Sequence, residues 1–256
     1  MREKHPVFDD QPPGETVIWR YYDLPKYLSM LDQEGLYFSR GDLLGDPLEG
    51  SFTRAREAER QRLLDNPPPG RTKDELQHVF AHNARYTALG PKSMYVNCWH
   101  ASEHESMAMW RGYGGGAFGI AVRSTFGLLD EALPERIKNS FREESIFLGR
   151  VRYLDYMSEA ERIPNEYNLY GPFLCKSLAY AHEKEVRAVF SDIPAGMGGS
   201  SAPGYVVKVN LARLITDVVI SPLAPPWFAD LVESMNRRMG FSFAFRTSVA
   251  GSAPIY

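Results

Sequence analysis

The stretch Thr16-Val-Ile-Trp-Arg-Tyr-Tyr22 sets the character of the chain. β-Branched and aromatic residues dominate it, which is typical of a β-strand. Alternation along a strand places Arg20 on the face opposite Trp19 and Tyr21. An arginine inside an apolar strand needs an anion or an exposed position. We therefore expect Arg20 to be either a surface or salt-bridged residue, or a clamp for a phosphate or carboxylate group.

The segments around this strand predict an N-terminal arm over residues 1–15 and a single α+β domain over residues 16–256. A helix follows the strand, with Asp23 as its N-cap and Gly35 at its end. We expect loops at residues 67–69 and 194–204. Further strands are expected at residues 36–39, 94–99, 118–124, 146–154, 185–190, 205–209, 218–221 and 243–247, and helices at 53–65, 72–88, 102–110, 169–182 and 226–239. This order mixes hairpin-like and helix-crossed strands. It favours a mixed, largely antiparallel central sheet with peripheral helices over a regular parallel array.

Composition excludes several classes of protein. The chain has 256 residues, of which 44% are hydrophobic and 24% charged, as in ordinary globular proteins. Its net charge of −3 gives no global basic field for nucleic acid. The two cysteines, Cys98 and Cys175, lack the number and spacing of a disulfide framework or a cysteine zinc site. No apolar run has the length of a membrane span and none begins the chain, so we expect a cytoplasmic protein without membrane contact.

Two pairs of acidic residues are candidates for chemistry. Glu183 and Glu185 bracket one residue at the start of a late strand, so both point to one face if the chain is extended. Two carboxylates on one face repel each other unless each has a partner or a role. Asp46 and Glu49 lie in a glycine-bounded loop. Asp46 precedes Pro47, which favours a turn, although two acids three residues apart could also hold a metal.

Other patterns give weaker signals. Two histidine pairs have helical spacing, but each lacks a third ligand and the His-Glu-x-x-His signature, so we expect no metal site there. These pairs are His78 with His82 and His100 with His104. The run from Gly112 to Gly116 lacks the Lys-Ser/Thr of a phosphate-binding loop and predicts a turn.

Several fragments occur together in a characteristic order. They are Trp19-Arg20-Tyr21, residues 36–39, residues 46–50, residues 95–99, Met107 to Trp110 with Tyr113, Lys176, and Glu183-x-Glu185-x-Arg187. In this order they resemble an uncharacterised bacterial family, the domain-of-unknown-function family twenty-nine seventy-one. The resemblance covers about residues 16 to 190 and brings no activity with it.

A more distant resemblance is to the ADP-ribosyltransferases. In that family a first strand carries Arg or His, a helix ends in Gly, a loop covers NAD, and a late strand carries the catalytic Glu, often the second acid of Glu-x-Glu. Arg20, Gly35, the loop at residues 40–50, Glu183 and Glu185 resemble those parts in that order. The Ser-Thr-Ser of the arginine-class enzymes is absent, and Asn97-Cys-Trp-His100 stands in its place.

This second resemblance implies a split central sheet and an NAD-dependent transferase, of the kind found among bacterial toxins and phage-defence effectors. NAD would be the substrate, and a protein or nucleic acid the acceptor of ADP-ribose. The implied catalytic residues are Glu185, Glu183 and Arg20. The implied NAD contacts are Arg20, Tyr21, Ser39, Arg40, Asp46, Trp110 and Tyr113.

The same resemblance assigns a role to each of these residues. Glu185 would stabilise positive charge on the ribose, and Glu183 would position or deprotonate the acceptor. Arg20 would hold the diphosphate or a ribose, and Tyr113 or Trp110 would stack on nicotinamide.

Two alternatives stay open. The first is a metal-dependent nuclease built on Asp46, Glu49, Glu183 and Glu185, with Lys176 near the scissile phosphate. A divalent-ion requirement would distinguish it. The second is a catalytically silent binding module, in which the acids and arginines form a structural ion-pair network. In that case, replacing single acids would lower stability, and the protein would bind no nucleotide.

Overall fold

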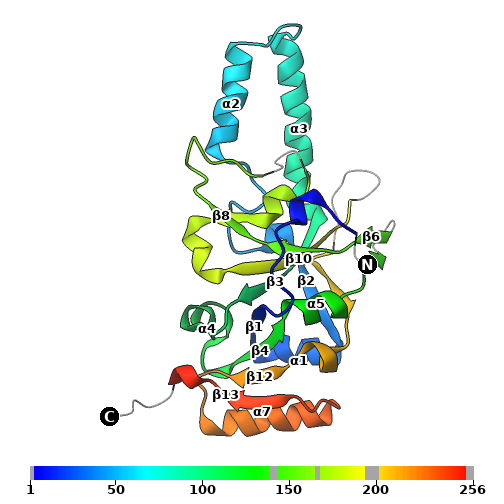
Figure 1. Cartoon of the computed structure of the whole chain (residues 1–256), viewed down its shortest axis with the longest axis vertical. Coiled ribbons are helices and arrows are strands. Elements are labelled where there is room, and N and C mark those ends of the chain that lie inside the picture. Colours follow the sequence, from blue (N-terminus) through cyan, green and yellow to red (C-terminus); the bar gives the residue numbers. More distant parts are fainter. Residues whose placement is uncertain (1–2, 139–142, 165–167, 194–201, 252–256) are drawn as a thin grey trace.

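A mixed sheet dominates the computed structural model of the chain, which describes residues 3–138, 143–164, 168–193 and 202–251 (Figure 1). Within these residues the main sheet has nine strands, in the order β11-β2-β3-β1-β4-β12-β13, with β10 beside β3 and β7 beside β10. They are β1 (Val17–Asp23), β2 (Gly35–Arg40), β3 (Met94–Ala101), β4 (Gly119–Thr125), β7 (Phe147–Arg150), β10 (Glu185–Ser191), β11 (Gly204–Lys208), β12 (Asp217–Ile220) and β13 (Ala244–Thr247). All neighbours pair antiparallel except β12 and β13. This is the α+β architecture that the sequence predicts.

The helices flank this sheet, and two short strand pairs complete the fold. The helices are α1 (Leu24–Asp32), α2 (Arg54–Asp65), α3 (Lys73–Ser93), α4 (Met107–Tyr113), α5 (Phe126–Ala132), α6 (Leu211–Leu214) and α7 (Pro226–Arg238). The short pairs are β5 (Arg136–Lys138) with β6 (Glu143–Ser145), and β8 (Arg152–Leu154) with β9 (Cys175–Ser177). Helices α2 and α3 form a hairpin that projects from the body, while α7 lies at the opposite end (Figure 1).

Local capping explains where several helices begin. Asp23 Oδ1 accepts a hydrogen bond from the Lys26 amide at 2.8 Å and starts α1, as predicted. Thr72 and Glu75 form a reciprocal capping box at the start of α3. The predicted linker at residues 67–69 joins α2 to α3 at the exposed tip of the hairpin.

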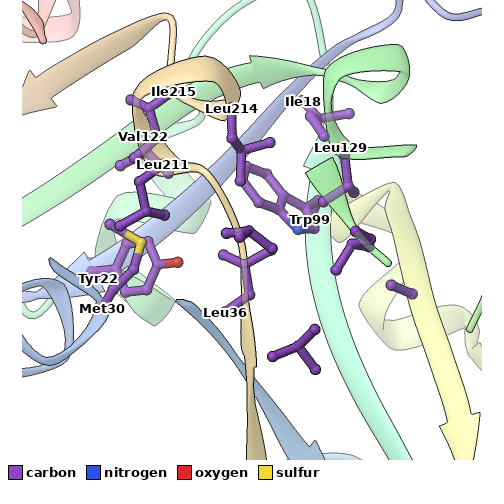
Figure 2. Close-up of a cluster of buried hydrophobic side chains, with 14 of the residues drawn as sticks. Ile18, Tyr22, Met30, Leu36, Trp99, Val122, Leu129, Leu211, Leu214 and Ile215 are labelled. Carbon is purple, nitrogen blue, oxygen red and sulfur yellow. The ribbon is translucent and has the colours of Figure 1, made fainter. Parts of the chain in front are cut away.

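The main hydrophobic core lies on one face of the sheet, against α1, α5, α6 and α7. Figure 2 shows Ile18, Tyr22 and Trp99 from the strands meeting Leu211 and Leu214 from α6. The side chains of Trp19 and Tyr21 instead pack with Met109 and Trp110 of α4 in a separate cluster on the other side. This arrangement confirms the alternation expected along the first strand.

The sheet splits beside β3. One edge of β3 pairs along its length with β10, but the other edge is shared, with β1 at His100 and Ala101 and with β2 at Tyr95 and Val96. The intervening Asn97 bridges the gap, because its Nδ2 donates to Tyr37 O at 2.9 Å and its Oδ1 accepts from Trp99 Nε1 at 2.7 Å. The sheet therefore opens between β1 and β2, as the resemblance to ADP-ribosyltransferases implied.

The prediction of a helix over residues 169–182 is wrong. Residues 171–174 and 178–183 form separate 3₁₀ turns, with β9 between them. The six residues from Gly171 to Lys176 are all buried. A surface helix buries only one stripe of residues, so such a continuous run needs irregular or extended backbone.

Two further boundaries differ from prediction. The helix expected over residues 102–110 begins later, as α4, with Ser106 as its N-cap, so Glu105 lies outside it. The Glu105 carboxylate instead accepts hydrogen bonds from Trp110 Nε1 and the Val249 amide, both at 2.8 Å. The strand expected over residues 146–154 is two strands, because the chain leaves the main sheet at Val151 and continues as β8.

The described part of the predicted N-terminal arm, residues 3–15, is anchored to the body. Phe8 is buried, and its ring stacks on Phe147 with centroids 5.1 Å apart. Most of the loop expected at residues 194–204 lies outside the described residues. Within the described part of the chain, no helix combines the length and apolar character needed to cross a membrane.

Candidate functional site

A cavity of about 400 Å³ lies at the split in the sheet. Strands β1, β2, β3, β9 and β10 and the end of α4 contribute to its lining. Six of the residues singled out from the sequence line this one cavity: Arg20, Tyr21, Ser39, Tyr113, Glu183 and Glu185. The fold thus brings together residues that are up to 165 positions apart in the chain.

Three other expected NAD contacts lie outside the cavity lining. Asp46 accepts from the amides of Leu48 and Ser177 at 2.9 and 3.1 Å, which is turn chemistry. Arg40 pairs with Asp42, with Nε 2.6 Å from Oδ1. Trp110 is buried and shares an edge-to-face contact with Tyr21, with ring centroids 4.9 Å apart.

A buried lysine joins the two candidate acids. Lys176 Nζ lies 2.5 Å from Glu183 Oε2 and 2.7 Å from Glu185 Oε1. A third carboxylate, that of Glu49, lies 3.6 Å from the same ammonium group. All four side chains are buried, so these charges interact with little screening by water.

Arg187 supplies the second cation of this cluster. Its guanidinium is fully buried, with Nε 2.5 Å from Glu185 Oε2, Nη1 donating to Phe173 O at 2.8 Å, and Nη2 paired with Glu49. Three carboxylates therefore face two cations. One negative charge is left over when every group is ionised, and burying an unpaired charge is costly.

The backbone brings the two acids together by a turn, not by one extended strand as expected. Glu183 ends a 3₁₀ turn, Lys184 adopts a left-handed conformation (φ 42°), and Glu185 begins β10. The carbonyls of this turn are held by β3, since the Ala101 amide donates to Lys184 O at 2.9 Å and His100 Nδ1 lies 2.6 Å from Glu183 O.

These surroundings shift the pKa values of the two carboxyl groups in opposite directions. Burial raises the pKa of the Glu183 carboxyl to about 7, and hydrogen bonding with Glu185 adds to the rise, while Lys176 and Tyr113 oppose it. Burial acts in the same sense on Glu185, but Arg187, the hydrogen bond with Glu183 and the charge of Lys176 together outweigh it and hold the pKa of that carboxyl well below its usual range. Near neutral pH, Glu185 is ionised and Glu183 exchanges its proton.

Tyr113 and Arg20 present the groups that remain open to a ligand. Tyr113 is 46% exposed, and its hydroxyl donates to Glu183 Oε1 at 2.5 Å. Arg20 reaches across the split to donate from Nη2 to Tyr37 O at 3.2 Å. Its Nη1 atom is buried and has no hydrogen-bond partner among the described residues. Lys26, which pairs with Asp23, lines the same cavity.

Sequence reasoning missed part of this arrangement. Lys176 and Glu49 were assigned no part in the NAD site, and His100 was assigned no contact with the acid pair. For His100 the missing information is the register between β3 and β10. In that register Glu185 pairs with His100 and Arg187 with Cys98. Lys26 carried no recognisable pattern. In the described residues, no group of three or more His, Cys, Asp or Glu is arranged to hold a metal ion.

The sequence matches no protein-family model and no curated protein. The resemblance to the domain-of-unknown-function family thus gains no support from family models. Among solved structures, the fold is similar to Thermus sp. 2.9 DarT in complex with NAD+, with a TM-score of 0.40 and 12% identity over 94% of this chain and 99% of that one. The same protein in complex with ADP-ribosylated ssDNA gives a TM-score of 0.38 and 13% identity over 94% and 97% of the two chains. The same protein in complex with carba-NAD+ gives a TM-score of 0.36 and 14% identity over 93% of this chain and 97% of that one. Similarity at this level assigns no function, which has to come from the residues of the cavity.

Proposed function

We propose that this chain is an NAD-dependent ADP-ribosyltransferase-like enzyme. It cleaves the nicotinamide–ribose bond and transfers ADP-ribose to a protein or nucleic acid acceptor. The observation that carries this proposal is the acid pair in the cavity: Glu183 and Glu185 share the buried Lys176 ammonium group at 2.5 and 2.7 Å, and Arg187 pairs with Glu185 alone of the two. This arrangement lowers the pKa of Glu185 and leaves that of Glu183 raised. Two carboxyl groups with separated pKa values are suited to one electrostatic and one acid–base role.

Such a pair suits the chemistry of NAD cleavage. Breaking the nicotinamide–ribose bond develops positive charge at the ribose, as in glycoside hydrolysis. The permanent negative charge of Glu185 stabilises that transition state in a cavity where water screens little. Glu183 accepts the proton that the acceptor loses when it attacks the ribose.

The proposed transfer is balanced in atoms and electrons and needs no further reagent. The electron pair of the C1′–N bond leaves with nicotinamide, whose ring changes from cationic to neutral. A lone pair of the acceptor forms the new bond to C1′, and the acceptor proton goes to Glu183.

The other end of the cavity suits the anionic part of the substrate. Arg20 and Lys26 line this end, and their positive charges suit a diphosphate, with Tyr21 and Ser39 as neighbouring walls. Trp110 lies beneath Tyr21 and supports it, so we assign no stacking on nicotinamide to Trp110. Tyr113 contacts the substrate at the acidic end.

The geometry weakens the nuclease alternative. Glu49, Glu183 and Glu185 already serve as partners of Lys176 and Arg187, and both oxygens of Asp46 accept from backbone amides. A divalent ion would have to displace these partners.

The binding-module alternative has a specific observation in its favour, since the buried ion-pair network that it predicts is present. A purely structural network, however, gives no reason for the Arg20 Nη1 that is buried without a hydrogen-bond partner among the described residues, or for the exposed Tyr113 held by Glu183.

NAD binding by calorimetry and release of free nicotinamide test the proposal in wild type and Glu185→Gln. Removing the charge is expected to lower nicotinamide release by about 10²-fold or more, as for other groups that stabilise transition-state charge. Glu233→Gln, on the exposed face of α7, is the matched control and should release nicotinamide like wild type. Circular dichroism melting checks that each variant is folded. If wild type neither binds NAD nor releases nicotinamide, the proposal is wrong and the binding module is favoured.

The biological role expected from the resemblance, as a toxin or phage-defence effector, is part of this proposal. Production of wild type in a bacterial host should then arrest growth, whereas Glu185→Gln should not. Equal growth with both proteins would count against a toxin.

A further inference from the structure

Tyr113 occupies an unusual position in the candidate site. It is the last residue of α4, the residue is 46% exposed, and its hydroxyl donates to Glu183 Oε1 at 2.5 Å. Its flanking residues are Gly112 and Gly114. The tyrosine is therefore both open to solvent and in direct contact with the acid–base group.

This contact has the geometry of a nucleophile and its general base. A hydroxyl is a weak nucleophile at neutral pH and is activated by a base within hydrogen-bond reach. Burial raises the pKa of the Tyr113 hydroxyl well above its usual range, and the hydrogen bond to Glu183 adds to the rise, so the phenol needs such a base. An external acceptor hydroxyl would have to take the place of the Tyr113 hydroxyl in order to reach Glu183 Oε1.

We infer that Tyr113 is itself an acceptor, and that the chain attaches ADP-ribose to its own Tyr113 oxygen. This inference rests on the proposed function. The C1′–N electrons of NAD leave with neutral nicotinamide, and a lone pair on the phenolic oxygen forms the bond to C1′. The phenolic proton passes to the Glu183 carboxylate.

Two other nucleophilic side chains of the cavity, those of Cys98 and Tyr21, are less well placed. The thiol of Cys98 lines the cavity, but burial raises its pKa far above the usual range, so the thiolate does not form. The Tyr21 hydroxyl is buried and accepts a hydrogen bond from the Ser106 amide at 2.9 Å. Neither side chain has a hydrogen bond to a carboxylate oxygen among the described contacts.

Modification of Tyr113 would slow further transfer by the same chain. An ADP-ribose group on Tyr113 would lie against Glu183 in the same cavity and obstruct the next acceptor. We therefore expect a burst of nicotinamide release, about one per chain, followed by a slower phase.

The experiment is to incubate wild type with NAD and to locate ADP-ribose by peptide mapping with mass spectrometry. The expected adduct is on Tyr113, resists neutral hydroxylamine, which cleaves an ester on a carboxylate, and is lost in Tyr113→Phe. Tyr37 is the matched control within the chain, because it is equally exposed, at 46%, but does not line the cavity. It should carry no adduct.

The outcomes separate the two proposals. Nicotinamide release with ADP-ribose absent from Tyr113, or equal labelling of Tyr113 and Tyr37, overturns this inference and leaves the proposed function standing. An absence of both nicotinamide release and adduct overturns both. In a mixture of wild type with isotope-labelled Glu185→Gln, the adduct should appear on the wild-type chain, and labelling mainly of the inactive chain would overturn reaction within one cavity.

Discussion

Two regions of the molecule are rich in charged residues but differ in burial. One is the α2–α3 hairpin, and the other is the cavity cluster, which consists of Glu49, Lys176, Glu183, Glu185 and Arg187. The cluster is buried, and its members touch one another. In the hairpin, α2 buries only Ala55, and no described side chain of α3 between Lys73 and Leu89 is buried. Charge density therefore says little about function, and what distinguishes a candidate site is charge removed from water.

The largest effect should come from removing one cation of the cluster. Arg187→Met keeps much of the volume but leaves Glu185 and Glu49 without their guanidinium partner. Removing one member of a buried pair costs about 3–5 kcal/mol. We expect a loss of this size in the free energy of unfolding, measured by urea denaturation.

The matched change in the hairpin is Arg85→Met, at an exposed position of α3. It should alter the unfolding free energy by no more than about 0.5 kcal/mol. Equal losses in the two variants would show that the buried network does not set stability, and would remove the contrast between the regions.

The second effect concerns pH and isolates Glu183. Its pKa of about 7 in the folded chain lies above the ordinary 4.5, so between these values the unfolded chain has released a proton that the folded chain keeps. The free energy of unfolding should therefore fall as pH rises through this window, by at most about 1.4 kcal/mol per pH unit.

Glu183→Gln should abolish this slope, whereas Glu57→Gln in the hairpin should retain it. Glu185 acts in the opposite sense, because its lowered pKa gives stability above pH 4.5 that is lost as the solution becomes more acidic. Urea denaturation at a series of pH values measures both. An unchanged slope in Glu183→Gln would contradict the separation of the two acids.

Apart from the Arg85→Met control, the smallest effect belongs to a contact within the hairpin. The Arg60 guanidinium lies over the Phe80 ring, 5.2 Å from its centroid, and is partly exposed. An exposed cation–π contact contributes about 0.5–1 kcal/mol, so Arg60→Ala should lower the unfolding free energy by that amount. A loss as large as that of Arg187→Met would mean that the hairpin is more tightly coupled to the body than its exposure indicates.

Much of the fold was predictable because its signals are local. The alternation in residues 16–22 places Arg20 and its neighbours on the correct faces, and the cap at Asp23 starts α1 at the expected residue. The helix expected over residues 169–182 failed because its apolar residues are buried by contacts from elsewhere in the chain. No local pattern reports that kind of burial.

The candidate site was predictable in its acids but not in their organisation. Glu183 and Glu185 stand out because they precede an apolar strand. That Lys176 joins them depends on the path of residues 175–183, which only tertiary structure determines. Likewise, the sequence does not distinguish Trp110 from Tyr113 as a candidate for stacking on nicotinamide. In the structure Trp110 packs beneath Tyr21 and does not line the cavity, whereas Tyr113 does.

The spread of the cavity residues along the chain has a consequence for protein synthesis. A ribosome that has completed residue 175 has released Arg20, Glu49 and Tyr113, but neither Lys176 nor the acid pair. Strand β3 also lacks β10, its partner along a whole edge, until residue 191 is made. The nascent chain therefore lacks the complete cavity cluster during most of its elongation, and the cavity forms only when the late segments fold against the early ones.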